Sequence, residues 1–168
     1  MLNRIFPKQF DNSYRGHWLA IWLFALVVLL KATQGVESII NTRNVVANAD
    51  GISLDGFSAA GVETFLALFA ILGLYVLVIP LQSLLVLIRY RAMIPFMYLL
   101  LLILYASNRG VLLLHPIVRS AAPAMGFGGH PIGYYVNFVI LVMTLIGFVL
   151  SLIGKRYRAT QEAKTVRL

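Results

Sequence analysis

The chain contains no cysteine and few charged residues. The absence of cysteine excludes disulfides, thiolate nucleophiles, iron–sulfur clusters and zinc sites built on cysteine. Charged residues make up 12% of the 168 residues, against about 25% in ordinary soluble domains. Because 60% of the residues are hydrophobic, much of the apolar surface has to face lipid.

The apolar residues fall in long blocks, and the short alternating segments typical of outer-membrane strands are absent. This pattern predicts an all-α polytopic membrane protein, a four-helix bundle that forms one domain over residues 1–168. The predicted transmembrane helices are residues 17–36, 59–88, 93–114 and 134–154, with outer loops at 37–58 and 115–133 and a basic tail at 155–168.

The first apolar run has the length of a signal-peptide core, and an A-x-A pattern follows at residues 47–49. That pattern lies 17 residues beyond Leu30, too far for cleavage beside the core, so we predict a retained span. The 13 residues from Trp18 to Leu30 cover only about 20 Å of a membrane core of roughly 30 Å, so the helix has to continue. We expect Lys31 to mark its outer end and to reach the headgroups.

The other spans contain irregularities. Pro80 lies inside the second span and predicts a kink, while Asp55 or Ser58 is available to cap its start. In the third span, the polar residues 106–110 interrupt the apolar pattern before it resumes. Part of the first outer loop is a candidate surface helix.

Basic residues indicate the orientation. Four spans put 10 of the 14 lysines and arginines on the side of the two termini, and the remaining four are Lys31, Arg43, Arg109 and Arg119. The positive-inside rule then predicts cytoplasmic termini, in the inner membrane of a bacterium. The basic tail is expected to bind anionic lipid headgroups. It has little of the aromatic interleaving typical of nucleic-acid binding and no recognisable motif, so we expect no nucleic-acid partner.

The candidate functional site centres on Arg109, because an arginine within an apolar run costs about 2.5 kcal/mol or more at the membrane centre. Tyr105 lies on the same helical face, four residues earlier. The predicted outer-leaflet cluster consists of Glu63, Tyr105, Asn108 and Arg109, with Glu37 as an alternative acidic partner. A structural ion pair, or snorkelling of Arg109 to the interface, is the competing interpretation.

The last span carries a stripe of small residues, which permits close contact between helices. Its members are Thr144, Gly147, Ser151 and Gly154. The stripe predicts a packing seam, either between two spans of one chain or between two proteins.

No cofactor or metal ion is predicted. His115 and His130 each precede a proline in the second outer loop, whereas haem ligands in membrane bundles normally lie on the helices. The glycines at 126–129 lack the lysine and hydroxyl residue of a phosphate-binding loop. Turn formation explains them, and a re-entrant loop is the alternative.

Three functional hypotheses follow. The first is an accessory or scaffolding subunit that binds other membrane proteins or its own copies, because no catalytic residues can be assigned. The second is a small oligomeric transporter or channel with its site around Arg109. The third is an enzyme acting on a lipid or quinone, with Glu63 as base and Arg109 as anion clamp, but no nucleophile accompanies this pair. We therefore expect a protein that is not an enzyme.

Overall fold

The computed structural model describes residues 5–7, 11–117 and 130–153, and all the regular secondary structure in this part is helical. The four long helices are α2 (Trp18–Ile40), α4 (Ala59–Arg89), α5 (Ile94–Leu114) and α6 (Ile132–Leu152), and three short ones are α3 (Thr42–Asn44), the π-helix η1 (Val45–Ala49) and the 3₁₀ helix η2 (Arg91–Met93). The long helices are apolar enough to cross a membrane, which confirms the prediction of four such helices. The largest difference in bounds is at the end of α2, predicted at residue 36 and found at Ile40.

Local chemistry explains where the helices begin and continue. The Ser58 hydroxyl accepts a hydrogen bond from the Gly61 amide at 3.2 Å, so Ser58 caps α4 as the sequence suggested. α4 continues through Pro80, which is buried. α5 likewise runs without a break through residues 106–110. Ala106 and Arg109 are good helix formers, and only Gly110 among these residues costs as much as about 1 kcal/mol in a helix.

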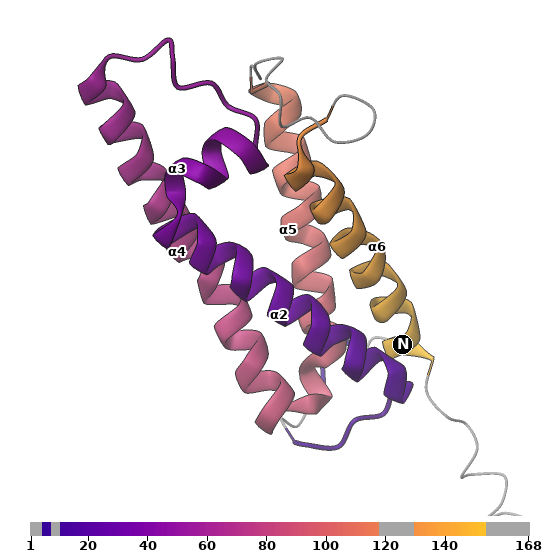
Figure 1. Cartoon of the computed structure of the whole chain (residues 1–168). Helices are drawn as coiled ribbons and strands as arrows, with labels where there is room; N and C mark the ends of the chain where they lie inside the picture. The colour runs from indigo at the N-terminus through magenta and orange to yellow at the C-terminus, as the bar shows by residue number, and fades with distance from the viewer. Residues whose placement is uncertain (1–4, 8–10, 118–129, 154–168) are drawn as a thin grey trace, which may run out of the picture.

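The chain segments before α2, between α4 and α5, and after α6 meet at one end of the fold, called here the near end (residues 11–17, 89–93 and 150–153). The His17 amide donates to the Leu150 carbonyl at 3.1 Å, and the Ala92 amide donates to the Asp11 carbonyl at 3.3 Å. These bonds hold all four long helices together at the near end (Figure 1).

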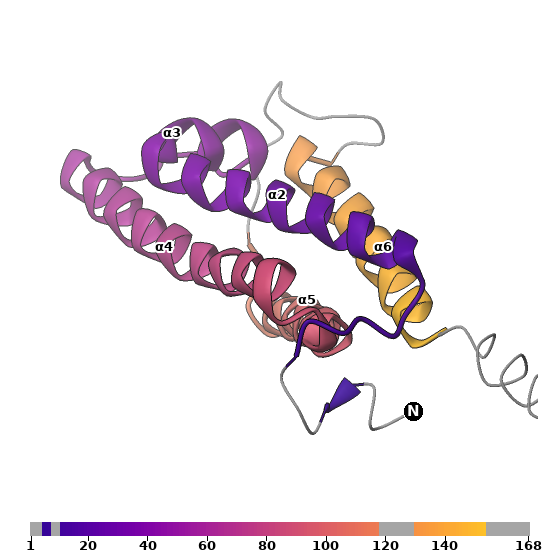
Figure 2. The same ribbon diagram turned by 90° about the horizontal axis from the view of Figure 1, so that it is seen from below.

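At the opposite end, called the far end (residues 40–59, 114–117 and 130–133), α4 and α5 diverge, with α3 and η1 beside the gap (Figures 1 and 2). The first loop contains helical residues, as expected, in α3 and η1. Gly51 has a φ of 68°, which lets the chain turn back after η1. A Cβ on Gly133 would come within 2.6 Å of the Ala49 carbonyl, so glycine permits α6 to start against η1.

The core lies where α2, α5 and α6 meet. Phe24 of α2 and Tyr98 of α5 are completely buried, and their ring centroids are 5.1 Å apart in an edge-on arrangement. The Tyr98 hydroxyl donates to the Ala20 carbonyl of α2 at 2.8 Å. α4 packs mainly on α2, where Cβ atoms on Gly35 and Gly73 would lie 3.1 Å from Leu77 and 2.8 Å from Ser38. Two glycines thus set the approach of α2 and α4.

Tyr14 gives the near end a dependence on alkaline pH. Its hydroxyl is buried, and burial raises the pKa of Tyr14 from 10.0 to about 12. Because the folded pKa is the higher one, Tyr14 stabilises the fold fully below pH 10 and loses that contribution as the pH rises from 10 to about 12. We expect the melting temperature of Tyr14→Phe to fall less than that of the wild type over this range. Parallel curves for the two proteins would contradict this role.

Candidate functional site

The structure does not bring the four residues of the predicted cluster together. Arg109 is exposed on α5, with its guanidinium carbon 5.0 Å from the centre of the Tyr134 ring of α6. Glu63 lies near the start of α4, and Figure 1 shows that this end of α4 is separated from α5 by the gap at the far end. An enzyme that uses these two residues as base and anion clamp would need them side by side. The divergence of α4 and α5 separates them.

The remaining predicted residues also have other surroundings. Asn108 is exposed on α5. The carboxylate of the alternative acid, Glu37, accepts a hydrogen bond from the side-chain nitrogen of Asn41 at 3.0 Å, and Glu37 is likewise exposed. Tyr105 is the one member that faces the interior, where its ring lies below the ammonium group of Lys31 at 4.7 Å from the ring centroid.

Lys31 forms an internal polar cluster, called here the lysine cluster (Lys31, Gln34, Tyr105 and Asn137). Its ammonium donates to the Gln34 side-chain oxygen at 2.9 Å and to the Asn137 side-chain oxygen at 3.1 Å. The cluster therefore joins α2, α5 and α6. The positive charge is balanced by two amide dipoles and a π face, without a carboxylate among these contacts.

A further hydrogen bond orients a member of the lysine cluster. The Asn137 amide nitrogen donates to the Gly133 carbonyl at 2.9 Å, which turns the amide oxygen toward Lys31. The Tyr105 hydroxyl is buried and has no hydrogen-bond partner within the described residues. In the lysine cluster, the Asn137 amide therefore makes hydrogen bonds through both its oxygen and its nitrogen, whereas the Tyr105 hydroxyl makes none with the described residues.

The position of Lys31 corrects the prediction that it marks the outer end of the first span. α2 continues for nine residues beyond it, to Ile40, so Lys31 lies about 3 Å from the middle of the helix. Asn137 provides an internal acceptor, and the side chain turns inward instead of reaching for headgroups. Hydropathy alone ended the span too early, because residues 37–40 are mixed in polarity.

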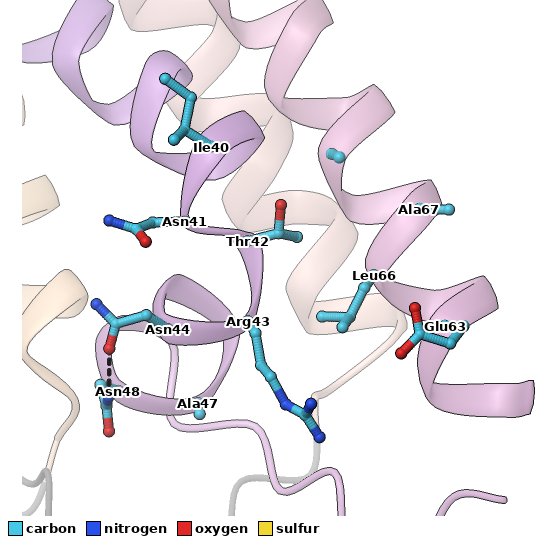
Figure 3. Close-up of a pocket in the computed structure, with 11 residues that line it drawn as sticks. Ile40, Asn41, Thr42, Arg43, Asn44, Ala47, Asn48, Glu63, Leu66 and Ala67 are labelled. Atoms are coloured by element: carbon cyan, nitrogen blue, oxygen red, sulfur yellow. Dashed lines mark hydrogen bonds between the residues drawn. The ribbon is translucent and has the colours of Figure 1, made fainter. Parts of the chain in front are cut away.

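A groove of about 700 Å³ opens at the far end between α3, η1 and α4 (Figure 3). Its lining combines three asparagines, one cation, one anion and an apolar floor. The lining residues are Ile40, Asn41, Thr42, Arg43, Asn44, Ala47, Asn48, Glu63, Leu66, Ala67 and Ala70. Figure 3 shows the asparagines at the left of this far-end groove, Arg43 extending from α3 in the middle, and Glu63 on α4 at the right.

Some polar groups of the far-end groove are already paired. The Thr42 hydroxyl donates to the Ser38 carbonyl at 2.9 Å, and Asn48 donates to the Asn44 side-chain oxygen. Arg43 and Glu63 are exposed and make no hydrogen bond or ion pair with another described residue. The groove therefore presents a cation and an anion that are both free to bind a ligand.

The small-residue stripe of the last span packs inside the chain. Thr144, Gly147 and Ser151 are buried, while Gly154 lies outside the described residues. A Cβ on Gly147 would collide with the Tyr98 phenol of α5. Of the two alternatives, contact between spans of one chain accounts for the described part of the stripe.

The histidines do not form a metal site in the part of the chain that is described. His130 stacks on Tyr134, with 4.6 Å between ring centroids. His115 follows α5 and is exposed. Within residues 5–7, 11–117 and 130–153, no three histidines or carboxylates gather as metal ligands would. The glycines at 126–129 and most of the proposed re-entrant loop, with Arg119 and the basic tail, lie outside this part.

The sequence contained signals for the residues that were missed. Asn137 and Gln34 have amide side chains within or near apolar spans, and Lys31 is a cation in such a span. Polar side chains inside a membrane usually pair with one another, and this rule alone indicates that Lys31 pairs with these amides. Asn41, Asn44 and Asn48 are spaced as neighbours on one helical face. The polar loop hid that periodicity.

The described helices define the class of molecule, an all-helical protein with four helices suited to cross a membrane. No family model, curated protein or solved structure matches the chain. Function has to be argued from its own residues.

Proposed function

We propose that the protein is a non-catalytic accessory subunit of a bacterial inner membrane that binds another membrane protein through α4. The near end faces the cytoplasm in this proposal, because it collects Arg15, Arg89 and Arg91 and because the basic tail follows Ile153 in the sequence. The far-end groove then faces outward.

The observation that carries the proposal is Gln82. Its side chain is exposed on α4 and makes no hydrogen bond with another described residue. It lies seven residues before Arg89, about 10 Å inward along the helix, within an apolar stretch. An amide that faces hydrocarbon has no partner there unless a second helix provides one.

The neighbours of Gln82 form a seam suited to a second helix. The seam has alternating spacings of three and four residues, the pattern of helices that pack along their length. Its members are Leu68, Ile71, Tyr75, Val78, Gln82 and Leu85, and all are exposed, Tyr75 by 68%. One polar position in such an apolar seam fixes the register of the partner.

A photoreactive phenylalanine in place of Leu85 tests the proposal in intact cells. We expect irradiation to cross-link the chain to a different membrane protein, and Gln82→Leu to reduce the yield severalfold because the interhelical hydrogen bond is lost. The matched control carries the probe in place of Ile103, which is 51% exposed on α5. Adducts with lipid alone at both positions would refute the proposal.

A small oligomeric transporter is the second candidate, and the lysine cluster favours it. A cation near the middle of α2 is the kind of residue that selects anions in a pore. Four helices rarely enclose a pore alone, so this function needs several copies. Cross-links only between copies of the chain would favour transport over the accessory role.

A further inference from the structure

We propose that the far-end groove binds a zwitterionic headgroup that carries a phosphate and a primary ammonium group, with Arg43 holding the phosphate and Glu63 the ammonium. The groove lies on the α3 side of α4, a different face from the Gln82 seam. The inference therefore stands independently of the partner proposed above.

The two charges provide the recognition. Arg43 extends from α3 and Glu63 from α4, so the opposite charges come from separate walls of the groove (Figure 3). The planar guanidinium fork matches two phosphate oxygens, and a carboxylate accepts hydrogen bonds from an ammonium group. A ligand with only one charge would leave one wall unpaired.

The asparagines add polar groups on the α3 and η1 side of the groove, beside the two charges (Figure 3). Asn48 donates to the oxygen of Asn44, so the nitrogen of Asn44 and the oxygen of Asn48 stay available. The Asn44 nitrogen can donate a hydrogen bond to a ligand, and the Asn48 oxygen can accept one. This pair suits the ester oxygens and hydroxyl groups that neighbour a phosphate.

The floor and the depth of the groove suit a molecule at a membrane surface. Leu66, Ala67 and Ala70 of α4 supply apolar contact below the charges. If the middle of α4 lies at the membrane centre, Glu63, 11 residues away, lies about 16 Å from that centre, near the boundary of a hydrocarbon core of roughly 30 Å. A phosphoethanolamine lipid and a soluble phosphoethanolamine compound share the required chemistry.

Native mass spectrometry of the full chain in mild detergent tests the site. The probes are phosphatidylethanolamine, its N-trimethylated form phosphatidylcholine, and phosphatidylglycerol. We expect phosphatidylethanolamine to bind most tightly, because only its headgroup has both a phosphate and N–H donors. Arg43→Gln and Glu63→Gln should each weaken this binding by about tenfold or more. Arg109→Gln and Asp55→Asn, which carry the same changes of charge, should leave it unchanged.

A competition with soluble glycerophosphoethanolamine identifies the source of the ligand. Displacement of the lipid shows that the headgroup suffices, and retention of the lipid shows that acyl chains on the α4 floor are required; either result keeps the zwitterion site. Equal binding of the three lipids by the wild-type chain would overturn it, as would full binding by Glu63→Gln. The lipid series uses the wild type alone, so it remains decisive if a variant folds poorly.

Discussion

Replacing Gly147 with leucine is expected to destroy the packing of α2, α5 and α6, with a loss of about 2–5 kcal/mol in the free energy of unfolding. Any Cβ at this position collides with the Tyr98 phenol. If Tyr98 moves away, its hydroxyl loses the 2.8 Å hydrogen bond to the Ala20 carbonyl, and its ring leaves Phe24. One substitution therefore disturbs all three helices.

Denaturant titration in detergent, followed by circular dichroism, measures this effect. Gly110→Leu is the matched control, because Gly110 lies on α5 and a Cβ there meets no atom within 4 Å. We expect the control to unfold like the wild type. Equal stability of the two leucine variants would show that Tyr98 does not pack on Gly147.

The second large effect is expected in the lysine cluster, where Asn137→Leu should destabilise the fold more than Lys31→Met. Removing the Asn137 oxygen leaves a partly buried ammonium with one acceptor fewer, which costs about 3 kcal/mol because the group is charged. Removing Lys31 takes away the charge itself and leaves only neutral amides unpaired, at about 1–3 kcal/mol.

The double variant separates this coupling from general damage to the core. Lys31→Met combined with Asn137→Leu should lose less stability than the sum of the two single variants, because the unpaired charge is gone. Asn108→Leu, at an exposed amide of α5, serves as the control for replacing an asparagine. A neutral Asn137→Leu, or additive losses in the double variant, would contradict the cluster.

The long helices could be predicted from the sequence because each is a block of apolar residues with a recognisable start. Ser58 caps α4 as expected, and α6 differs from its predicted bounds by two residues at each end. These features depend on neighbours in the chain. Hydropathy and capping are local properties, so a single sequence contains them.

The candidate site could not be predicted in the same way, because it depends on how the helices diverge. Glu63 and Arg109 are both polar residues near the far ends of their helices, and a compact bundle would have brought them together. Close contact through Gly35 and Gly73 instead holds α4 on α2. Which helix α4 packs against depends on the shapes of the helix surfaces, and the periodicity of hydrophobic residues in the sequence does not reveal this.

The direction of the Lys31 side chain could not be predicted from the local sequence either. Its sequence position near the end of an apolar run favoured a side chain reaching out to headgroups. Asn137, 106 residues later, changes that outcome by accepting a hydrogen bond inside the fold. The interior of the bundle thus depends on pairs of residues that are far apart in the sequence, and a short segment of the sequence does not contain both members of such a pair.

The distance between Lys31 and Asn137 along the chain has a consequence for biogenesis. During synthesis α2 emerges before α5 and α6, so the ammonium has Gln34 at hand first, the Tyr105 ring once α5 is made, and Asn137 only after α6 is made. In a membrane, helices insert before they associate, and an early α2 would carry its charge without its final acceptor. A chain terminated before α6 should therefore be retained at the insertion machinery or degraded.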